Sequence, residues 1–204
     1  MTYIVIDATE LPIPRIDEFV EQWRARAEII STADGFREAR LLRAVAPDAA
    51  LPLVMVAHWD SREAKDTALK NPRLENSAAE YTQVHGGGYE IAAEYHSGTT
   101  ADGSGVEFVN AFELPAERMD EFLAHWRGRA EVMVKAPGFH YNRMHRALDP
   151  QSRFQAVNVA HWASADEWRA AGANPAFQQR LAAAPPFFTA NPALYDVAAR
   201  FSPR

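Results

Sequence analysis

An internal repeat is the feature that most constrains how this chain can fold. Glu10-Leu11-Pro12 recurs as Glu113-Leu114-Pro115, and His58-Trp59 recurs as His161-Trp162, in both cases 103 residues further along. The same offset relates further pairs, namely Phe19 to Phe122, Trp23 to Trp126, Arg26 to Arg129, Gly35 to Gly138 and Asn71-Pro72 to Asn174-Pro175. A repeat of roughly 100 residues is long enough to bury its own core, unlike solenoid repeats of about 20–50 residues. We therefore expect two copies of one compact unit.

Composition limits the function without specifying it. The chain has 204 residues, a net charge of −6 and scattered basic residues, which argues against a nucleic-acid surface. It has no cysteine, so disulfides, thiol nucleophiles and thiolate metal sites are excluded. No apolar run approaches the ~20 residues that span a bilayer, and the N-terminus lacks the basic region of a signal peptide. We expect a cytoplasmic globular protein without a membrane partner.

Both copies show the same order of secondary structure. In the first copy the patterns predict strands at 3–8, 36–45, 53–59 and 89–95, a helix over 16–30, a second helix from Ser61 to Leu69, and a further helical piece to about Val84. In the second copy they predict strands at 106–112, 139–147, 154–162 and 195–201, a helix near 117–134, and a helix from Ser164 that is interrupted at Asn174-Pro175.

This β-α-β-β-α-β order is that of a ferredoxin-like α+β unit, an antiparallel sheet with both helices on one face. The other sheet face needs cover, because the run at 53–56 is apolar on both sides of its strand. We therefore predict two ferredoxin-like repeats packed sheet-to-sheet as an intramolecular, pseudo-dimeric α+β barrel. The domains are residues 1–96 and 106–204, joined by a Gly/Ser/Thr-rich linker at 97–105. The chain is expected to be a monomer of this kind, with further homo-oligomers left open.

Differences between the copies give the functional lead. Asn158 stands where the first copy has Met55, and Asn110 stands where it has Asp7. A carboxamide on a largely apolar strand must be explained by its hydrogen bonds. Strand alternation places Asn158 on the same face as Trp162, whose counterpart Trp59 favours a structural role. The second copy is the candidate active unit, and the first is a degenerate or supporting copy.

The pattern Val-Asn-Val-Ala-His-Trp at 157–162 sets Asn158 four residues before Trp162. With Asn110 on the first strand, it resembles the antibiotic-biosynthesis monooxygenase (ABM) family. The resemblance covers both halves except the linker. It implies a cofactor-independent monooxygenase that oxidises an anthrone- or hydroquinone-like polyketide to a quinone with O₂. Asn110, Asn158 and Trp162 are then the catalytic residues, with O₂ as co-substrate and a small aromatic molecule as partner.

A proton acceptor is also needed, and three residues are candidates for a general base or a substrate contact. His125 and His145 occur only in the second copy, and Tyr141 shares a strand face with His145. The duplicated His58 and His161 favour a structural role. No metal site is expected, because no histidines or carboxylates have ligand spacing. Two alternatives stay open: a non-catalytic ligand-binding barrel, and a haem-binding or haem-degrading relative, although 177–181 lacks a histidine.

Overall fold

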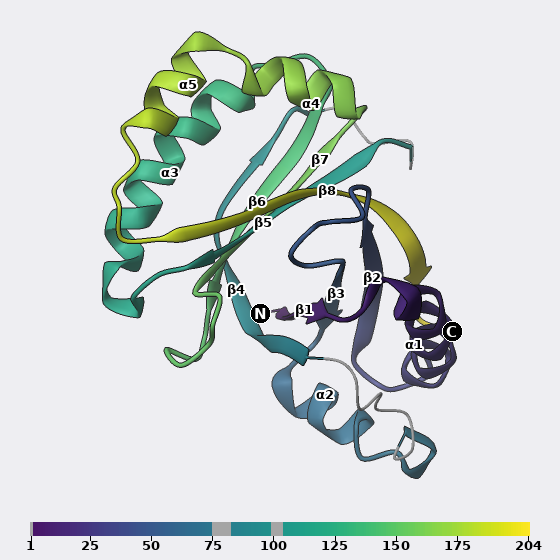
Figure 1. Cartoon of the computed structure of the whole chain (residues 1–204). Helices are drawn as coiled ribbons and strands as arrows, with labels where there is room; N and C mark the ends of the chain where they lie inside the picture. Colours follow the sequence, from purple (N-terminus) through teal and green to yellow (C-terminus); the bar gives the residue numbers. More distant parts are fainter. Residues whose placement is uncertain (1, 75–82, 99–103) are drawn as a thin grey trace. The chain divides into compact units, whose positions relative to one another are not determined.

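The computed structural model describes residues 2–74, 83–98 and 104–204 (Figure 1). Its elements follow the chain in this order: β1 (Tyr3–Glu10), η1 (Ile13–Arg15), α1 (Ile16–Ile30), β2 (Phe36–Ala44), β3 (Leu53–Trp59), α2 (Arg62–Ala68), η2 (Pro72–Leu74), β4 (Gln83–His96), β5 (Val106–Glu113), η3 (Ala116–Arg118), α3 (Met119–Met133), β6 (Phe139–Ala147), β7 (Ala156–Trp162), α4 (Ala165–Gly172), α5 (Pro175–Ala182) and β8 (Thr189–Phe201). None of the helices in these ranges is long and apolar enough to cross a membrane.

The eight strands form one closed hydrogen-bonded order, β1-β3-β2-β8-β5-β7-β6-β4. This order confirms the predicted α+β barrel of two ferredoxin-like repeats. By its contacts the chain divides into two compact units, which are not identical to the sequence repeats. Unit 1 contains residues 1–90 and 196–204, and unit 2 contains residues 91–195. The last strand of each repeat therefore begins in one unit and ends in the other.

In unit 1, β3 is the partner of both β1 and β2, and the first part of β4 pairs with β1. One face of this sheet packs against helices. Leu53 and Leu41 form a core with Ile16 and Val20 of α1, and Trp59 packs edge-on against Phe36 with ring centroids 5.3 Å apart. The end of β8 belongs to the same core.

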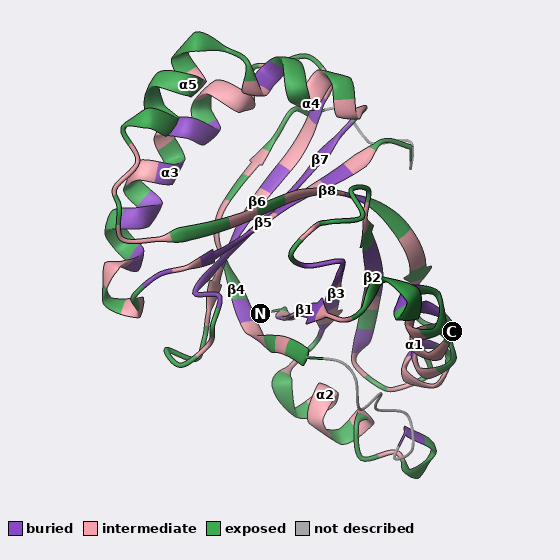
Figure 2. Ribbon diagram, viewed as in Figure 1, coloured by how far each residue is buried: buried purple, intermediate pink, exposed green. Residues whose placement is uncertain are grey.

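In unit 2, β7 is the partner of both β5 and β6, and it is buried along its whole length (Figure 2). α3 lies on one face of this sheet beside α5 (Figure 1). Phe112 of β5 packs against Phe122 of α3 with centroids 4.7 Å apart, and Phe188 contacts both rings. Burying each such side chain contributes about 1.5–3 kcal/mol. This aromatic layer fixes α3 against the sheet.

Local signals fix the helix ends in the same way in both copies. The hydroxyl oxygens of Ser61 and Ser164 accept hydrogen bonds from backbone N–H groups in the first turns of α2 and α4. Gly35 and Gly138 follow α1 and α3 with φ of 80° and 75°, a conformation that only glycine adopts without strain. Each of these glycines accepts a 2.8 Å hydrogen bond at its carbonyl from the residue that follows β3 or β7.

Most predicted elements match the structure, including the strands at 53–59 and 139–147. The last strand of each copy is longer than predicted, because β4 begins at Gln83 and β8 at Thr189. The helical piece predicted to reach Val84 is wrong at its end, where Gln83 and Val84 pair with β1, and its residues 75–82 lie outside the described residues. Residues 99–103 of the predicted linker also lie outside them.

Candidate functional site

The two asparagines singled out from the repeat are direct neighbours in unit 2. Asn110 of β5 and Asn158 of β7 are cross-strand partners, and Met144 of β6 pairs with Asn158 on its other side. Met144 belongs to the core formed with α3, and so do Phe112 and Ala156, which lie two residues from the asparagines along their strands. Since alternate residues share a face, both carboxamides lie in the layer between the sheet and α3.

Both carboxamides are poorly satisfied in this layer. Asn158 is only 5% exposed, and neither its Oδ1 nor that of Asn110 has a hydrogen-bond partner among the described residues. Asn142 pairs with Ala160 on the same face, and its buried Oδ1 also has no hydrogen-bond partner among the described residues. An unpaired buried polar atom costs about 1–3 kcal/mol. Each of these three acceptors needs a partner that the described residues do not supply, such as a bound ligand or a water molecule.

Trp162 lies on the same face, at the end of β7. Its indole ring is 1% exposed and packs edge-on against Phe139, with centroids 5.5 Å apart. Trp59 and Phe36 repeat this packing in unit 1. The shared geometry explains why both copies keep this tryptophan. In addition, the Trp162 Nε1–H has no acceptor in the described part of the chain, so it is a donor available to a ligand.

α3 adds two basic groups, His125 and Arg129, one turn apart. Burial, with a contribution from the Arg129 charge, lowers the pKa of His125, so its imidazole is neutral at pH 7. Arg129 is 7% exposed, and its Nε and Nη2 lack acceptors among the residues described. Its guanidinium lies 5.9 Å from the ring centroid of Phe188, in the aromatic layer already described. A buried cation without a partner is costly, so this position favours an anionic ligand.

Arg129 is a candidate residue that the sequence did not single out. It matches Arg26, and a residue shared by both copies favours a structural role, as for His58 and His161. In unit 1 the charge of Arg26 acts on Asp7, at the position that Asn110 occupies in unit 2. The first copy therefore supplies its own anion, whereas the second has exchanged that anion for a neutral amide. Reading the Asp7/Asn110 exchange together with the Arg26/Arg129 match is the signal that identifies Arg129.

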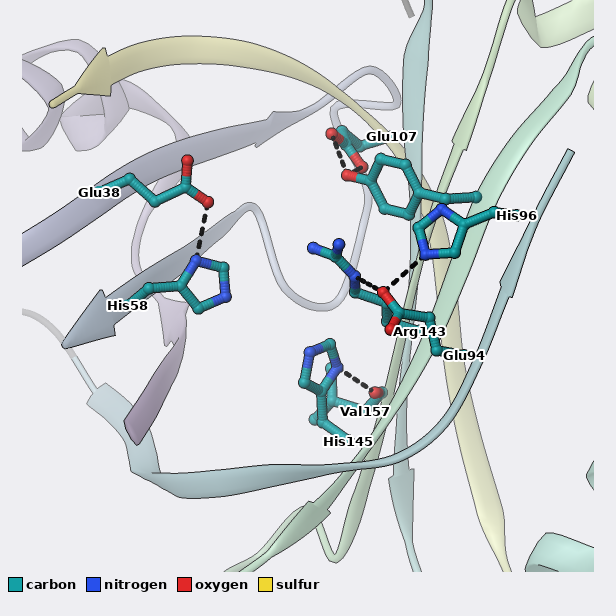
Figure 3. Close-up of polar contacts among 9 residues, drawn as sticks. Glu38, His58, Glu94, His96, Glu107, Arg143, His145 and Val157 are labelled. Carbon is teal, nitrogen blue, oxygen red and sulfur yellow. Dashed lines mark hydrogen bonds and ion pairs between the residues drawn. The ribbon is translucent and has the colours of Figure 1, made fainter. Parts of the chain in front are cut away.

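The other two predicted residues lie on the opposite face of the unit 2 sheet. Tyr141 pairs with His161 and donates from its hydroxyl to the Glu107 carboxylate at 3.0 and 3.1 Å, and Glu107 is 1% exposed. His145 pairs with Val157 and has its Nδ1 3.0 Å from the Val157 carbonyl oxygen (Figure 3). The structure thus places Asn110, Asn158 and Trp162 on one face of the sheet, which α3 with His125 covers, and places Tyr141 and His145 on the other face.

In the described ranges, no group of three or more histidine or acidic side chains is arranged to hold a metal ion.

An open hollow of about 520 Å³ lies in unit 1, at the end of β1 and the β2–β3 loop. Its lining residues, which are 10–13, 47–50, 52 and 83, include none of the predicted site residues.

The repeated β-α-β-β-α-β order and the closed strand order place this chain in the class of tandem ferredoxin-like α+β barrels. The antibiotic biosynthesis monooxygenase family matches the chain twice, over residues 2–79 and 106–183. The chain belongs to this family, as the resemblance implied. A comparison with curated proteins found no match.

Solved structures share the fold. An anthrone oxidase-like protein superposes with a TM-score of 0.73 at 14% identity, covering 98% of this chain and 92% of its own. A putative monooxygenase from Lactobacillus acidophilus NCFM gives 0.64 at 10% identity, covering 98% and 96%. SnoaB, a cofactor-independent oxygenase from Streptomyces nogalater, is 29% identical over 46% of this chain and 93% of its own, with a TM-score of 0.40. The first two likenesses show a shared fold, and the family gives this fold a monooxygenase-like character.

Proposed function

We propose that unit 2 oxidises an electron-rich hydroxyaromatic compound of the anthrone or hydroquinone type with O₂, without metal or organic cofactor. The observation that carries the proposal is the buried layer between sheet and α3, where unpartnered acceptors, an unpartnered indole N–H and an unpaired guanidinium occur together. Membership of the monooxygenase family supports the reaction class. The non-catalytic ligand-binding barrel remains the rival reading.

The hydrogen-bond and charge partners that the buried side chains lack indicate the substrate class. The Oδ1 atoms of Asn110 and Asn158 need hydrogen-bond donors, which phenolic hydroxyls supply. Arg129 needs a negative charge, which an enolate or phenolate supplies. The Trp162 ring and the aromatic layer favour a flat polycycle. A weakly acidic, hydroxylated aromatic molecule satisfies all three requirements.

Each residue then has a role in the reaction. His125, held neutral, takes a proton from the anthrone carbon, and the electron pair of that C–H bond delocalises onto the carbonyl oxygen. Arg129 stabilises this oxyanion, and the carboxamides orient the ring. The electron-rich carbon then bonds to O₂, and the resulting peroxide takes back the proton that His125 holds. His125 next removes the second proton from that carbon, the electron pair of the C–H bond forms the new C=O bond, and the O–O bond breaks to release hydroxide. The hydroxide takes this proton, so anthrone and O₂ yield quinone and water.

The test is O₂ consumption by metal-free protein with 1,8-dihydroxyanthrone. Wild type is expected to exceed the buffer rate, and Asn158→Ala or Arg129→Met is expected to lose about 10²–10³ in rate. Asn110→Asp restores the acid–cation arrangement of unit 1 and is expected to lower the rate by a similar factor, because Arg129 then has an internal counter-ion. Binding of the anthrone without O₂ uptake would instead support the ligand-binding barrel.

Tyr141→Phe is the matched control, because it removes a polar group from the opposite face of the same sheet. It is expected to leave the rate within about twofold while lowering stability by about 1–3 kcal/mol, since the buried Glu107 loses a donor. A loss of activity in this variant equal to that of Asn158→Ala would contradict the placement of the site.

We also infer that the active species is a monomer, with residues 106–204 contributing the catalytic repeat. Both repeats are present in one chain, and the strands of the described ranges follow a closed order, so none of these strands offers a second copy a free edge. Light scattering on the active sample is expected to give about 22.7 kDa. Activity confined to a dimer fraction would contradict this.

A further inference from the structure

The open hollow of unit 1 is not used by the proposed oxidation. It lies between the end of β1 and the loop that joins β2 to β3, and its volume is about 520 Å³. Two carboxylates, those of Glu10 and Asp48, line it together with leucine, isoleucine, alanine and proline side chains. None of the described residues in this lining is basic. The hollow therefore combines negative charge with an apolar wall.

The loop that forms one side of this hollow has a counterpart of the same length in unit 2, between β6 and β7. The backbone hydrogen bonds that close the two loops are equivalent, from the Ala44 N–H to the Pro52 carbonyl at 2.9 Å and from the Ala147 N–H to the Gln155 carbonyl at 3.0 Å. A second backbone hydrogen bond spans three residues inside each loop, with lengths of 3.3 Å and 3.1 Å. The two loops can therefore be compared position by position, with the repeat offset of 103 residues.

In unit 2 an arginine from this loop covers the carboxylate at the end of the first strand. Arg153 stands at the loop position where unit 1 has Ala50, and Glu113 stands where unit 1 has Glu10. The Nε and Nη2 atoms of Arg153 lie 3.1 Å and 3.0 Å from Oε1 of Glu113. The same guanidinium lies 4.9 Å from the ring centroid of Phe154. Unit 2 thus supplies its own guanidinium to this carboxylate.

Unit 1 keeps the carboxylate but has no arginine at this loop position. Glu10 and Ala50 both line the hollow, which therefore lies where the side chain of Arg153 lies in unit 2. His85 also contacts Glu10, with its Nε2 3.2 Å from Oε1. A carboxylate can accept about four hydrogen bonds, so this contact leaves room for a guanidinium on the same group.

Exposed apolar side chains lie beside the hollow. Ile13, which lines it, is 57% exposed, and Val45 and Val84 are 50% and 51% exposed. Val45 and Val84 lie within two residues of the lining residues Pro47 and Gln83. Large apolar side chains gathered in this way mark protein-interaction surfaces, and arginine is enriched among the residues that contribute most to such contacts. This combination favours an arginine on a polypeptide over a free small cation.

We propose that the hollow of unit 1 binds an arginine side chain of a partner polypeptide. Its guanidinium lies on Glu10, as that of Arg153 lies on Glu113, and its apolar neighbours in the partner contact Ile13. A guanidinium suits this position better than an ammonium, because its planar fork donates two hydrogen bonds to one carboxylate. Asp48 adds a second negative charge beside it. The proposal is independent of the oxidation proposed for unit 2.

The experiment titrates the full ¹⁵N-labelled chain with the peptide acetyl-Leu-Arg-Leu-amide and follows the backbone amide signals by NMR. We expect saturable shifts at 10, 13 and 48–50, with a Kd on the order of 1 mM. The same peptide with citrulline keeps the shape but loses the charge, and it is expected to bind about tenfold more weakly or less. Acetyl-Gly-Arg-Gly-amide is also expected to bind more weakly, because it has no apolar side chains to contact Ile13.

Three variants test the position of the guanidinium. Ala50→Arg supplies unit 1 with the arginine that unit 2 already has, and it is expected to abolish the shifts because the hollow is then filled. Glu10→Gln is expected to weaken binding about tenfold or more. Glu21→Gln is the matched control, since it makes the same change of charge at an exposed position of α1, and it is expected to leave the affinity unchanged. Circular dichroism verifies that each variant is folded.

Absence of shifts at the hollow in wild type, or an unchanged affinity in Ala50→Arg, overturns the proposal. Binding of the citrulline peptide as tight as that of the arginine peptide overturns it as well. Equal affinities for the leucine and glycine peptides would overturn the assignment to a polypeptide, because the exposed apolar side chains would then take no part. None of these results bears on O₂ uptake in unit 2, so the two proposals fail separately.

Discussion

Replacing Asp7 by asparagine is expected to stabilise the protein at neutral pH. The pKa of Asp7 rises from 3.8 to about 6 on folding, mainly because the carboxyl is buried. Between these pH values the folded state binds more protons than the unfolded state, so the free energy of unfolding falls as pH rises. Each pKa unit corresponds to about 1.4 kcal/mol, which gives a cost of roughly 3 kcal/mol above pH 6. Partial exposure of the side chain reduces this to about 2 kcal/mol.

Urea unfolding followed by tryptophan fluorescence measures this cost. The free energies of wild type and Asp7→Asn are compared at pH 4 and at pH 8, and the variant is expected to gain about 2 kcal/mol more at pH 8 than at pH 4. Other titrating groups contribute equally to both proteins, so their effects cancel in this difference. Asp48→Asn, with the same change at an exposed position, is expected to show no such dependence.

A gain that is equal at both pH values would refute the reasoning, since it would show that Asp7 titrates normally in the folded protein. A larger gain at pH 4 than at pH 8 would show that its pKa is depressed by Lys65 and Arg26 rather than raised by burial.

Two further predictions concern unit 1. A 2.7 Å hydrogen bond from His58 lowers the pKa of Glu38 to about 2. The stabilisation by Glu38 is therefore present above pH ~4.5 and is lost as pH falls toward 2. In urea unfolding, Glu38→Gln is expected to cost about 1 kcal/mol at pH 7, after discounting for exposure, and nothing at pH 2. In thermal unfolding, Gly86→Ala is expected to destabilise the protein by about 1–3 kcal/mol, because the new methyl group meets the Asp7 carboxyl. Gly172→Ala has open space around its methyl group and is expected to stabilise the protein by about 0.5 kcal/mol. Equal effects of the two alanines would contradict the crowding at Gly86.

The sequence predicted the central elements well because local signals agree with the final packing there. The apolar run of β3 and the N-cap of α2 have the same meaning in isolation and in the fold. It underestimated β4 and β8, whose starts contain Gly86–Gly88 and Pro192. These residues disfavour a strand locally, yet pairing with β1 and β5 extends both strands.

The faces of the sheet were only partly predictable. Alternation placed Asn158 and Trp162 together, and Tyr141 with His145, as the structure shows. It did not reveal that these pairs lie on opposite faces, because that requires the register between β6 and β7. A bulge between Phe139 and Tyr141 shifts this register, so that Phe139 faces Trp162 while Tyr141 faces His161.

The sequence alone determined the duplicated α+β architecture and the places where the copies differ, because a repeat and its hydrophobic periodicity are local properties of the chain. Only the tertiary structure decided what those differences mean. It showed that Asp7 and Asn110 each lie in a layer with an arginine from a facing helix, one arginine under the influence of a carboxylate and the other without a partner for its buried Nε and Nη2. Whether a buried charge is compensated depends on groups distant in sequence, so no local pattern records it.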